Sequence, residues 1–245
     1  MLKKAMEYLV GLGEAHIKEV KLPDGAVQLY SDKPLNRLSK HIPVAESVRM
    51  GTLTSLVDYV KAGVDRMADK MIIHVTSPQE ALLLSQLNEN RERECLVRVE
   101  AQIPDFPYGR FIGHEEFCIN AQAKFMDDPE TDKGLLLKFA GTVENGTVAE
   151  YGDNGVTQKA TVKRGIASKT EAIVPNPVRL RPYRTFIEVE QPASEFIFRM
   201  KDSGGVSCAL FEADGGAWKN AAMKNIKDYL ESELVDFKGR FTVIS

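Results

Sequence analysis

The segment from residue 173 to residue 234 constrains the fold most strongly, because two different periodicities follow one another within it. Two runs alternate between apolar and polar residues, as a strand with one buried face does. The apolar positions are Phe196, Phe198 and Met200 in the first run and Val206, Cys208 and Leu210 in the second. The segment 201–205 between the runs is polar and contains two glycines, so the two runs predict a β-hairpin.

The apolar period lengthens from two to four directly after this hairpin. Asp214 is a residue type that caps the first turn of a helix, and every fourth residue after it is apolar. These apolar positions are Trp218, Ala222, Ile226, Leu230 and Leu234. The pattern predicts a helix whose apolar side, including the only tryptophan of the chain, packs against the hairpin. A closing strand is predicted over 241–244.

Residues 1–45 are predicted to form a separate N-terminal region. An amphipathic helix, a hairpin with a Pro-Asp-Gly turn and a proline-containing tether are expected there. The helix is expected over residues 2–12 and the tether over residues 32–43. The hairpin is expected over residues 17–31, with its turn at Pro23, Asp24 and Gly25. The remaining residues, 46–245, are predicted to be a single α+β domain.

The apolar spacing between these regions predicts helices and strands in mixed order. The expected elements are a helix over 52–67, a strand over 71–75, a helix from Ser77 onward, a strand over 95–103, a helix over 115–127 and a strand over 186–189. From Gly134 the period is mostly two, which predicts an antiparallel meander through Val162, while a short helix over 142–150 is the alternative. The predicted fold class is α+β, with a mixed α/β N-terminal half and an antiparallel sheet with a packed C-terminal helix in the second half.

Composition and charge exclude several classes of protein. The 245 residues carry a formal net charge of -3, with 43% hydrophobic and 27% charged residues, as in an ordinary globular protein. This charge does not favour binding of nucleic acid or anionic membranes through the whole surface. No apolar run approaches the roughly 20 residues that span a bilayer, so no membrane association is predicted. Cys95, Cys118 and Cys208 each lie in an apolar run, which favours free thiols in a reducing intracellular compartment.

The sequence matches no catalytic or metal-binding motif. His114 and Cys118 are four residues apart and form at most half of a zinc site, and no second half is evident. The acidic residues between 127 and 132 lack the alternate spacing and the glycine of a calcium-binding loop. We therefore predict no catalytic residue, no metal and no cofactor, and we favour a non-enzymatic function. An enzyme would require Asp, Glu and His side chains from distant segments to meet in one pocket.

The run RLRPYR at residues 179–184 is the candidate binding site. Arginine side chains bind phosphates, and aromatic rings stack on bases. The residues Arg179, Arg181, Tyr183 and Arg184 therefore predict a patch that binds anions or nucleic acid. The other interpretation is a solvent-facing edge strand, in which charge and proline prevent pairing with further strands.

Three stretches of the chain resemble the phage- and prophage-encoded YfdQ-like family, a domain of unknown function. They are TLTSLVDYVKAG at 52–63, HEEFCINAQAKFMDD at 114–128, and the segment that runs from VPNPVRLRPYRTFIEVE at 174–190 through the hairpin into the helix. The resemblance covers most of the chain after residue 45 and rests on apolar patterns. It implies a phage or prophage origin and expression in the cytoplasm of a bacterial host cell, and it assigns no catalytic residues.

Two functions follow as hypotheses. The first is a non-enzymatic phage or prophage accessory protein that acts by self-assembly into a homo-oligomer or by binding a phage or host protein. The second is the binding of single-stranded nucleic acid, a nucleotide or another phosphate-bearing ligand in phage replication, recombination or counter-defence. The position of the three arginines in the fold separates the two hypotheses.

Overall fold

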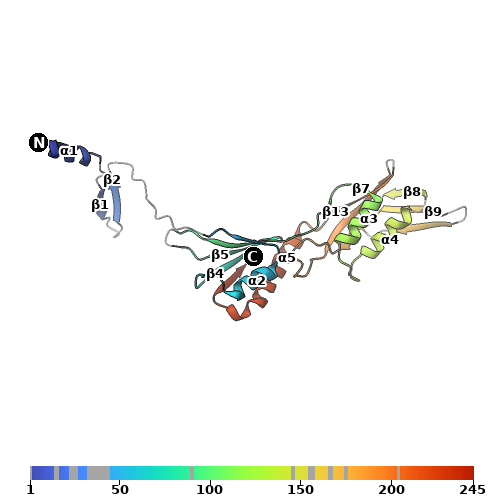
Figure 1. Ribbon diagram of the computed structural model, residues 1–245. Helices are drawn as coiled ribbons and strands as arrows, with labels where there is room; N and C mark the ends of the chain where they lie inside the picture. Colours follow the sequence, from blue (N-terminus) through green and yellow to red (C-terminus); the bar gives the residue numbers. More distant parts are fainter. Residues whose placement is uncertain are drawn as a thin grey trace. The chain divides into compact units, whose positions relative to one another are not determined.

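The computed structural model describes ten stretches of the chain (Figure 1). They are residues 2–13, 17–21, 27–31, 45–88, 91–144, 147–153, 158–164, 168–173, 176–202 and 205–245, with side chains except at 27–29, between 142 and 173, and at 202. The chain divides into two compact units, residues 1–44 and residues 45–245. The turn predicted at Pro23, Asp24 and Gly25 and the tether predicted over 32–43 lie outside the described residues.

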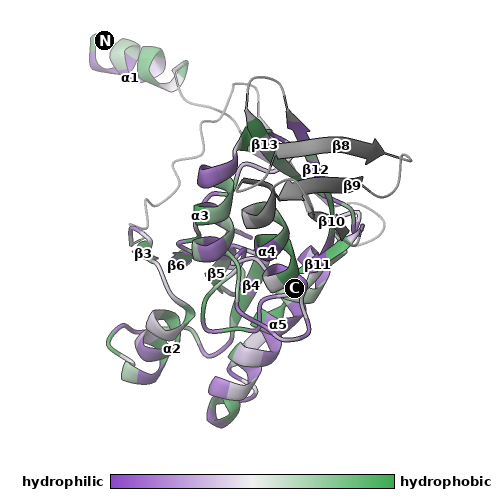
Figure 2. Cartoon of the chain, turned by 90° about the vertical axis from the view of Figure 1, so that its right-hand side faces the viewer, coloured by the Kyte–Doolittle hydropathy of each residue, from purple (hydrophilic) through white to green (hydrophobic). Residues whose placement is uncertain are grey.

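The N-terminal unit contains the helix and the two strands that its sequence predicts. α1 spans Leu2–Gly11, and β1 (Ile17–Lys21) pairs antiparallel with β2 (Val27–Ser31). Hydrophobic and hydrophilic residues alternate along α1 (Figure 2). None of the residues of α1 is buried, so its apolar side chains are exposed to solvent.

A mixed five-stranded sheet forms one part of the larger unit. Its strands are β3 (Val48–Met50), β4 (Met71–Ser77), β5 (Glu80–Ser85), β6 (Cys95–Glu100) and β14 (Phe241–Ile244), in the order β14-β4-β5-β6-β3. The strands β4, β5 and β6 are antiparallel neighbours, whereas β14 lies parallel to β4 and β3 lies parallel to β6. The predicted closing strand is therefore confirmed, and it joins the sheet that begins near the start of this unit.

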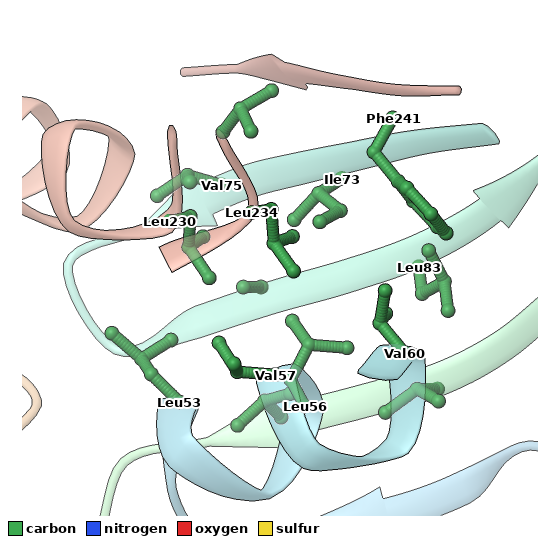
Figure 3. Packing of buried hydrophobic residues seen from close by; sticks show 14 of the residues in the cluster. Leu53, Leu56, Val57, Val60, Ile73, Val75, Leu83, Leu230, Leu234 and Phe241 are labelled. Atoms are coloured by element: carbon green, nitrogen blue, oxygen red, sulfur yellow. The ribbon is translucent and has the colours of Figure 1, made fainter. Parts of the chain in front are cut away.

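The helices α2 (Leu53–Ala62) and α5 (Ala217–Glu233) pack with this sheet in one hydrophobic core (Figure 3). Alternate residues of the strands point into the core, so that Ile73 and Leu83 are fully buried. Other side chains of the core are Leu56 and Val57 from α2, Val75 from β4, Leu230 from α5 and Phe241 from β14. Each such side chain contributes about 1.5–3 kcal/mol to the stability of the fold when it is fully buried. The core therefore holds β14, the last strand of the chain, against the sheet.

α2 is shorter than its sequence predicts. Its first turn is capped by Thr52, whose Oγ1 accepts a hydrogen bond from the backbone N–H of Ser55 at 3.1 Å. Gly63 follows the last turn with a φ of 59°, a left-handed conformation that glycine adopts at low cost. Val64, which the helical spacing assigned to the buried face, is 79% exposed because it lies beyond this glycine.

A second sheet carries the predicted hairpin. Its strands are β7 (Ile112–Gly113), β11 (Val178–Leu180), β12 (Ser194–Asp202) and β13 (Val206–Glu212), all antiparallel in the order β11-β12-β13-β7. Within the hairpin Phe196 lies opposite Glu212 and Met200 lies opposite Cys208. The helices α3 (His114–Lys124) and α4 (Lys133–Glu144) share a largely aromatic core with this sheet. The predicted helix over 115–127 is confirmed as α3.

A third, three-stranded sheet follows α4. It consists of β8 (Thr147–Asp153), β9 (Gln158–Arg164) and β10 (Ser168–Ile173), in the order β10-β9-β8. All pairs in it are antiparallel. The predicted meander is confirmed for these strands, although it begins after residue 144 and not at Gly134.

The helix predicted from Ser77 is wrong, because this segment is the turn and second strand of a β-hairpin. The hydroxyl of Ser77 accepts a hydrogen bond from the backbone N–H of Gln79 at 3.1 Å. Glu80 does not return to cap a helix; it accepts a hydrogen bond from Thr76 and forms an ion pair with Arg98. The leucine-rich run that follows is hydrogen-bonded on both sides, and its period alone cannot separate a buried strand from a buried helix.

The strand predicted from Gly134 is also wrong, because the first part of that segment is α4. Leu136, Phe139 and Ala140 are buried at helical spacing, whereas Leu135 is 51% exposed. Consecutive leucines satisfy both a period of two and a period of 3.6, and packing against α3 and the second sheet selects the helix.

The strand predicted over 186–189 is a turn. The side-chain oxygen of Gln191 accepts the backbone N–H groups of Arg184 and Thr185 at 3.0 and 3.2 Å. Its side-chain nitrogen donates to the carbonyl oxygens of Phe186 and Val189 at 2.8 and 3.2 Å. One buried amide thus provides the hydrogen bonds that a neighbouring strand would otherwise supply.

The helix predicted after Asp214 is confirmed as α5, but its main packing partner differs from the prediction. All five predicted inward residues are buried. Ile226, Leu230 and Leu234 belong to the core of the five-stranded sheet and not to the core beneath the 196–210 hairpin. The α+β fold class is confirmed by this arrangement of helices with mixed and antiparallel sheets.

Candidate functional site

Of the four residues of the predicted binding patch, only Tyr183 and Arg184 line a common cleft. Arg179 lies in β11, the outer strand of its sheet, between the buried Val178 and Leu180. Its side chain is exposed and faces Glu195 across the strand pair. Its backbone N–H donates to a carboxylate oxygen of Asp132 at 2.7 Å, which fixes the strand to the loop before α4. This position corresponds to an edge strand with one outward charge.

Arg181 is held between two carboxylates. Its Nε lies 3.0 Å from Oδ2 of Asp128, and its Nη1 lies 3.0 Å from Oε1 of Glu190. Its side chain is only 15% exposed. A phosphate at this position would have to compete with two resident carboxylates for the same guanidinium.

Arg184 is buried and is the centre of a polar network. Its Nη1 donates to Oε1 of Glu212 at 2.8 Å, and its Nη2 donates to the hydroxyl of Ser194. The guanidinium carbon lies 4.0 Å from the centre of the Trp218 ring, within the range of a cation–π contact. Burial lowers the pKa of Arg184, and neighbouring groups that include Glu212 oppose this effect. The local role of Arg184 is therefore to join β12, β13 and α5.

Ser194 connects this network to the first turn of α5. Its hydroxyl donates to Oδ2 of Asp214 at 2.7 Å, and Oδ1 of Asp214 accepts the backbone N–H of Gly216 at 3.0 Å. Burial raises the pKa of Asp214, but hydrogen bonds from Ser194 and from the backbone of Gly216 and Trp218 outweigh it and hold the pKa below its ordinary value. Asp214 is not the N-cap of α5 as predicted: Gly216 holds that position without a side-chain cap, and the Asp214 carboxylate instead accepts the backbone N–H of this glycine.

Tyr183 and Arg184 line an open cleft of about 860 Å³ in the larger unit. Its walls come from the β4–β5 turn, the segment after β6, residues 183–184 and the first two turns of α5. A volume of this size lies within the range of about 300–1,000 Å³ that small-molecule sites occupy. Its aromatic and cationic lining includes Tyr108, Lys124, Tyr183, Arg184, Trp218 and Lys219.

No pattern in the sequence predicts this cleft, because its residues come from segments that are distant in the chain. Trp218 was assigned to the core from helical spacing, and at 7% exposure it is buried, yet it also lines the cleft. The turn that forms another wall was predicted to be the start of a helix. The available signal was Tyr108, an aromatic residue in a loop rich in proline and glycine, where aromatic side chains often mark a binding surface.

The structure also shows the surroundings of the His114–Cys118 pair and of the Cys208 thiol. His114 and Cys118 lie one turn apart on α3, with Nε2 and Sγ 3.5 Å apart. Across the described stretches, no three or more His, Cys, Asp or Glu side chains are arranged to hold a metal ion. Burial, with a smaller contribution from Cys118, raises the pKa of the Cys208 thiol to about 12, so this thiol is protonated at neutral pH.

Comparisons with known proteins give no match to a family model, to a curated protein or to a solved structure. The resemblance to the YfdQ-like family therefore stays a prediction. In the part of the chain that the structure describes, no helix combines the length and the apolar character needed to cross a bilayer.

Proposed function

We propose that this protein is a non-enzymatic phage or prophage accessory protein that assembles into a homo-oligomer, or binds a phage or host protein, through its N-terminal helix. The phage origin rests on the resemblance to the YfdQ-like family. The observation that carries the proposal is the exposed apolar face of α1. The residues of this face, which are between 57% and 79% exposed, are Leu2, Met6, Leu9, Val10 and the following Leu12.

The spacing of the apolar residues along α1 brings several of them together on one face. At 100° per residue, Leu2, Met6, Leu9 and Val10 fall on one side of the helix, and Lys4 falls on the opposite side. Each of these side chains gains about 1.5–3 kcal/mol when it moves from water into a fully buried contact. The whole face therefore supplies a substantial driving force for association.

The N-terminal unit also needs a partner for its own stability. α1 has 10 residues, fewer than the roughly 12–15 that an isolated helix needs in water. A single two-stranded hairpin is marginally stable at best. Neither α1 nor β1 contains a buried residue. A second copy of the chain offers an apolar face of the same size and kind, so self-association is the simplest way to cover it.

Replacement of Met6 and Leu9 by Glu is expected to abolish this association. The wild-type chain should elute with a mass of at least twice 27.3 kDa in size-exclusion chromatography with light scattering, and the double variant should elute as a monomer. The reason is that two charges would be buried in an apolar contact at a cost of several kcal/mol. The matched control is Lys4→Glu, which changes the net charge by the same amount on the opposite side of α1. A wild-type monomer that also retains no partner from a cell lysate would contradict the proposal.

The alternative proposal is that the arginine cluster binds single-stranded nucleic acid or another phosphate-bearing ligand. The arrangement of charge supports it less well, since Arg181 and Arg184 are paired with carboxylates and Arg179 alone of the three is exposed. Under this alternative we expect Arg179→Ala to weaken oligonucleotide binding and to reduce the salt slope by about 0.7. Fluorescence anisotropy at several salt concentrations measures both quantities, with the exposed Arg66→Ala as control. Equal effects of the two substitutions would rule out a specific patch.

A further inference from the structure

The open cleft has an aromatic wall whose rings are held in place. The ring of Tyr108 is stacked on that of Phe196, with centres 5.5 Å apart and planes 13° apart. The ring of Phe106 lies 4.8 Å from Tyr108 in a tilted contact. Tyr183 and Trp218 also line the cleft. Rings that are fixed before binding can stack on a planar ligand with little loss of side-chain entropy.

Two buried hydrogen-bond donors at this cleft lack an acceptor. They are Nε1 of Trp218 and Nε of Arg184, and neither finds a hydrogen-bond partner among the described residues. Trp218 is 7% exposed and Arg184 is 5% exposed, and both line the cleft. Both nitrogen atoms are themselves buried, so an acceptor in the cleft reaches them only if a neighbouring side chain moves, and the case for a ligand rests on the rings, amides and cations that line the cleft.

The charge of the lining favours an anion. Three cationic side chains, those of Lys124, Arg184 and Lys219, line the cleft together with two carboxylates, those of Asp105 and Glu212. Glu212 is already paired with Arg184. The cleft is therefore slightly positive in a chain whose net charge is -3, which attracts an anionic ligand to this site more than to the rest of the surface.

Amide side chains supply the remaining polar groups. Gln79, from the β4–β5 turn, and Asn220, from the first turns of α5, both line the cleft. An amide presents a donor and an acceptor together, and this pair matches the edge of a nucleic-acid base. Stacking rings, amide groups and cations in one cleft are the three kinds of contact that a nucleotide requires.

We propose that this cleft binds a mononucleotide, a planar base that carries a sugar phosphate. The base stacks against the wall that contains Tyr108 and Tyr183, and the phosphate lies towards the cationic side chains, with Lys219 as the most accessible of them. This site goes beyond association through α1 and does not depend on it, because α1 contributes no residue to the cleft.

The single tryptophan of the chain makes the proposal directly testable, since Trp218 lines the cleft. Full-length protein is titrated separately with the 5′-monophosphates of adenosine, guanosine, cytidine and uridine, with tryptophan fluorescence and calorimetry as readouts. We expect saturable changes in both signals for at least one mononucleotide. Inorganic phosphate alone and the matching nucleoside alone should each bind at least about tenfold more weakly, because each loses one kind of contact.

A matched pair of lysine variants locates the binding. Lys219 and Lys224 are both exposed on α5, but Lys224 lies outside the cleft and pairs with Asp228. Lys219→Ala should weaken mononucleotide binding about tenfold, whereas Lys224→Ala should change it by less than about twofold. Both changes are on the surface, and circular dichroism confirms that each variant is folded.

Four outcomes would overturn the proposal. They are the absence of binding by all four mononucleotides at millimolar concentration, calorimetric binding without a change in tryptophan fluorescence, equal losses in Lys219→Ala and Lys224→Ala, and binding of inorganic phosphate as tight as that of the mononucleotide. Binding of a single-stranded oligonucleotide without binding of any mononucleotide would also overturn it, and would support the alternative function at the arginine cluster. A change in oligomeric state affects none of these readouts, so the two proposals can fail independently.

Discussion

Leu136→Ala is expected to lower the free energy of unfolding by about 2–5 kcal/mol, whereas Leu135→Ala, one residue earlier, should lower it by less than about 1 kcal/mol. Leu136 is 1% exposed, in the core between α4 and the second sheet, and its truncation leaves a cavity there. Leu135 is 51% exposed and loses few contacts. Urea unfolding followed by circular dichroism measures both values.

The two variants also test the backbone assignment of this segment. A strand over the same residues would place Leu135, Leu137 and Phe139 on one face and Leu136 on the other. Leu135→Ala would then lower the free energy of unfolding more than Leu136→Ala. A larger loss for Leu135→Ala would therefore contradict α4. The pair is well matched, because both substitutions remove the same atoms from neighbouring positions of one element.

Glu212→Gln is expected to destabilise the protein by about 2–3 kcal/mol, while Arg184→Met should change the stability by less than about 1 kcal/mol. Removal of Glu212 leaves the charge of Arg184 buried without its ion-pair partner. The loss is smaller than for a fully buried pair, since the Glu212 side chain is 42% exposed. Replacement of Arg184 by an apolar residue of similar length removes the buried charge itself and keeps the contact with Trp218.

The same comparison tests the structural role of Arg184 in the network. Thermal and urea unfolding of the two variants and of Arg179→Ala, which is exposed and should lie within about 0.5 kcal/mol of wild type, provide the measurements. A neutral Glu212→Gln together with a strongly destabilising Arg184→Met would contradict the prediction that the unpaired charge of Arg184 costs more stability than its removal.

Local pattern predicted those elements in which a single period dominates the segment. The hairpin of β12 and β13 has a strict period of two, and α5 has apolar residues at a spacing of four, so both follow from residues close in sequence. The prediction of secondary structure failed in leucine-rich runs, because Leu82, Leu83 and Leu84 fit a helix or a strand equally well until their packing neighbours are known.

The candidate site was less predictable than the elements. Two residues of RLRPYR, Tyr183 and Arg184, line the cleft. The sequence could not indicate that Asp128, Glu190 and Glu212 neutralise two of its arginines, because these carboxylates come from other segments. The cleft itself depends on residues from six separate segments, and no local pattern contains that information.

Residues close together in the chain were enough to predict the α+β class, the amphipathic α1, the hairpin and the helix α5, because periodicity and turn residues act over a few positions. Only the tertiary structure decided that β14 and α5 pack with the five-stranded sheet, that residues 133–144 are helical, and that Arg184 is buried beside Trp218. The physical reason is that burial and charge pairing are set by contacts between distant segments. The segment 173–234 therefore supplies residues 183–184, Glu212 and the first turns of α5 to a cleft that other parts of the chain complete.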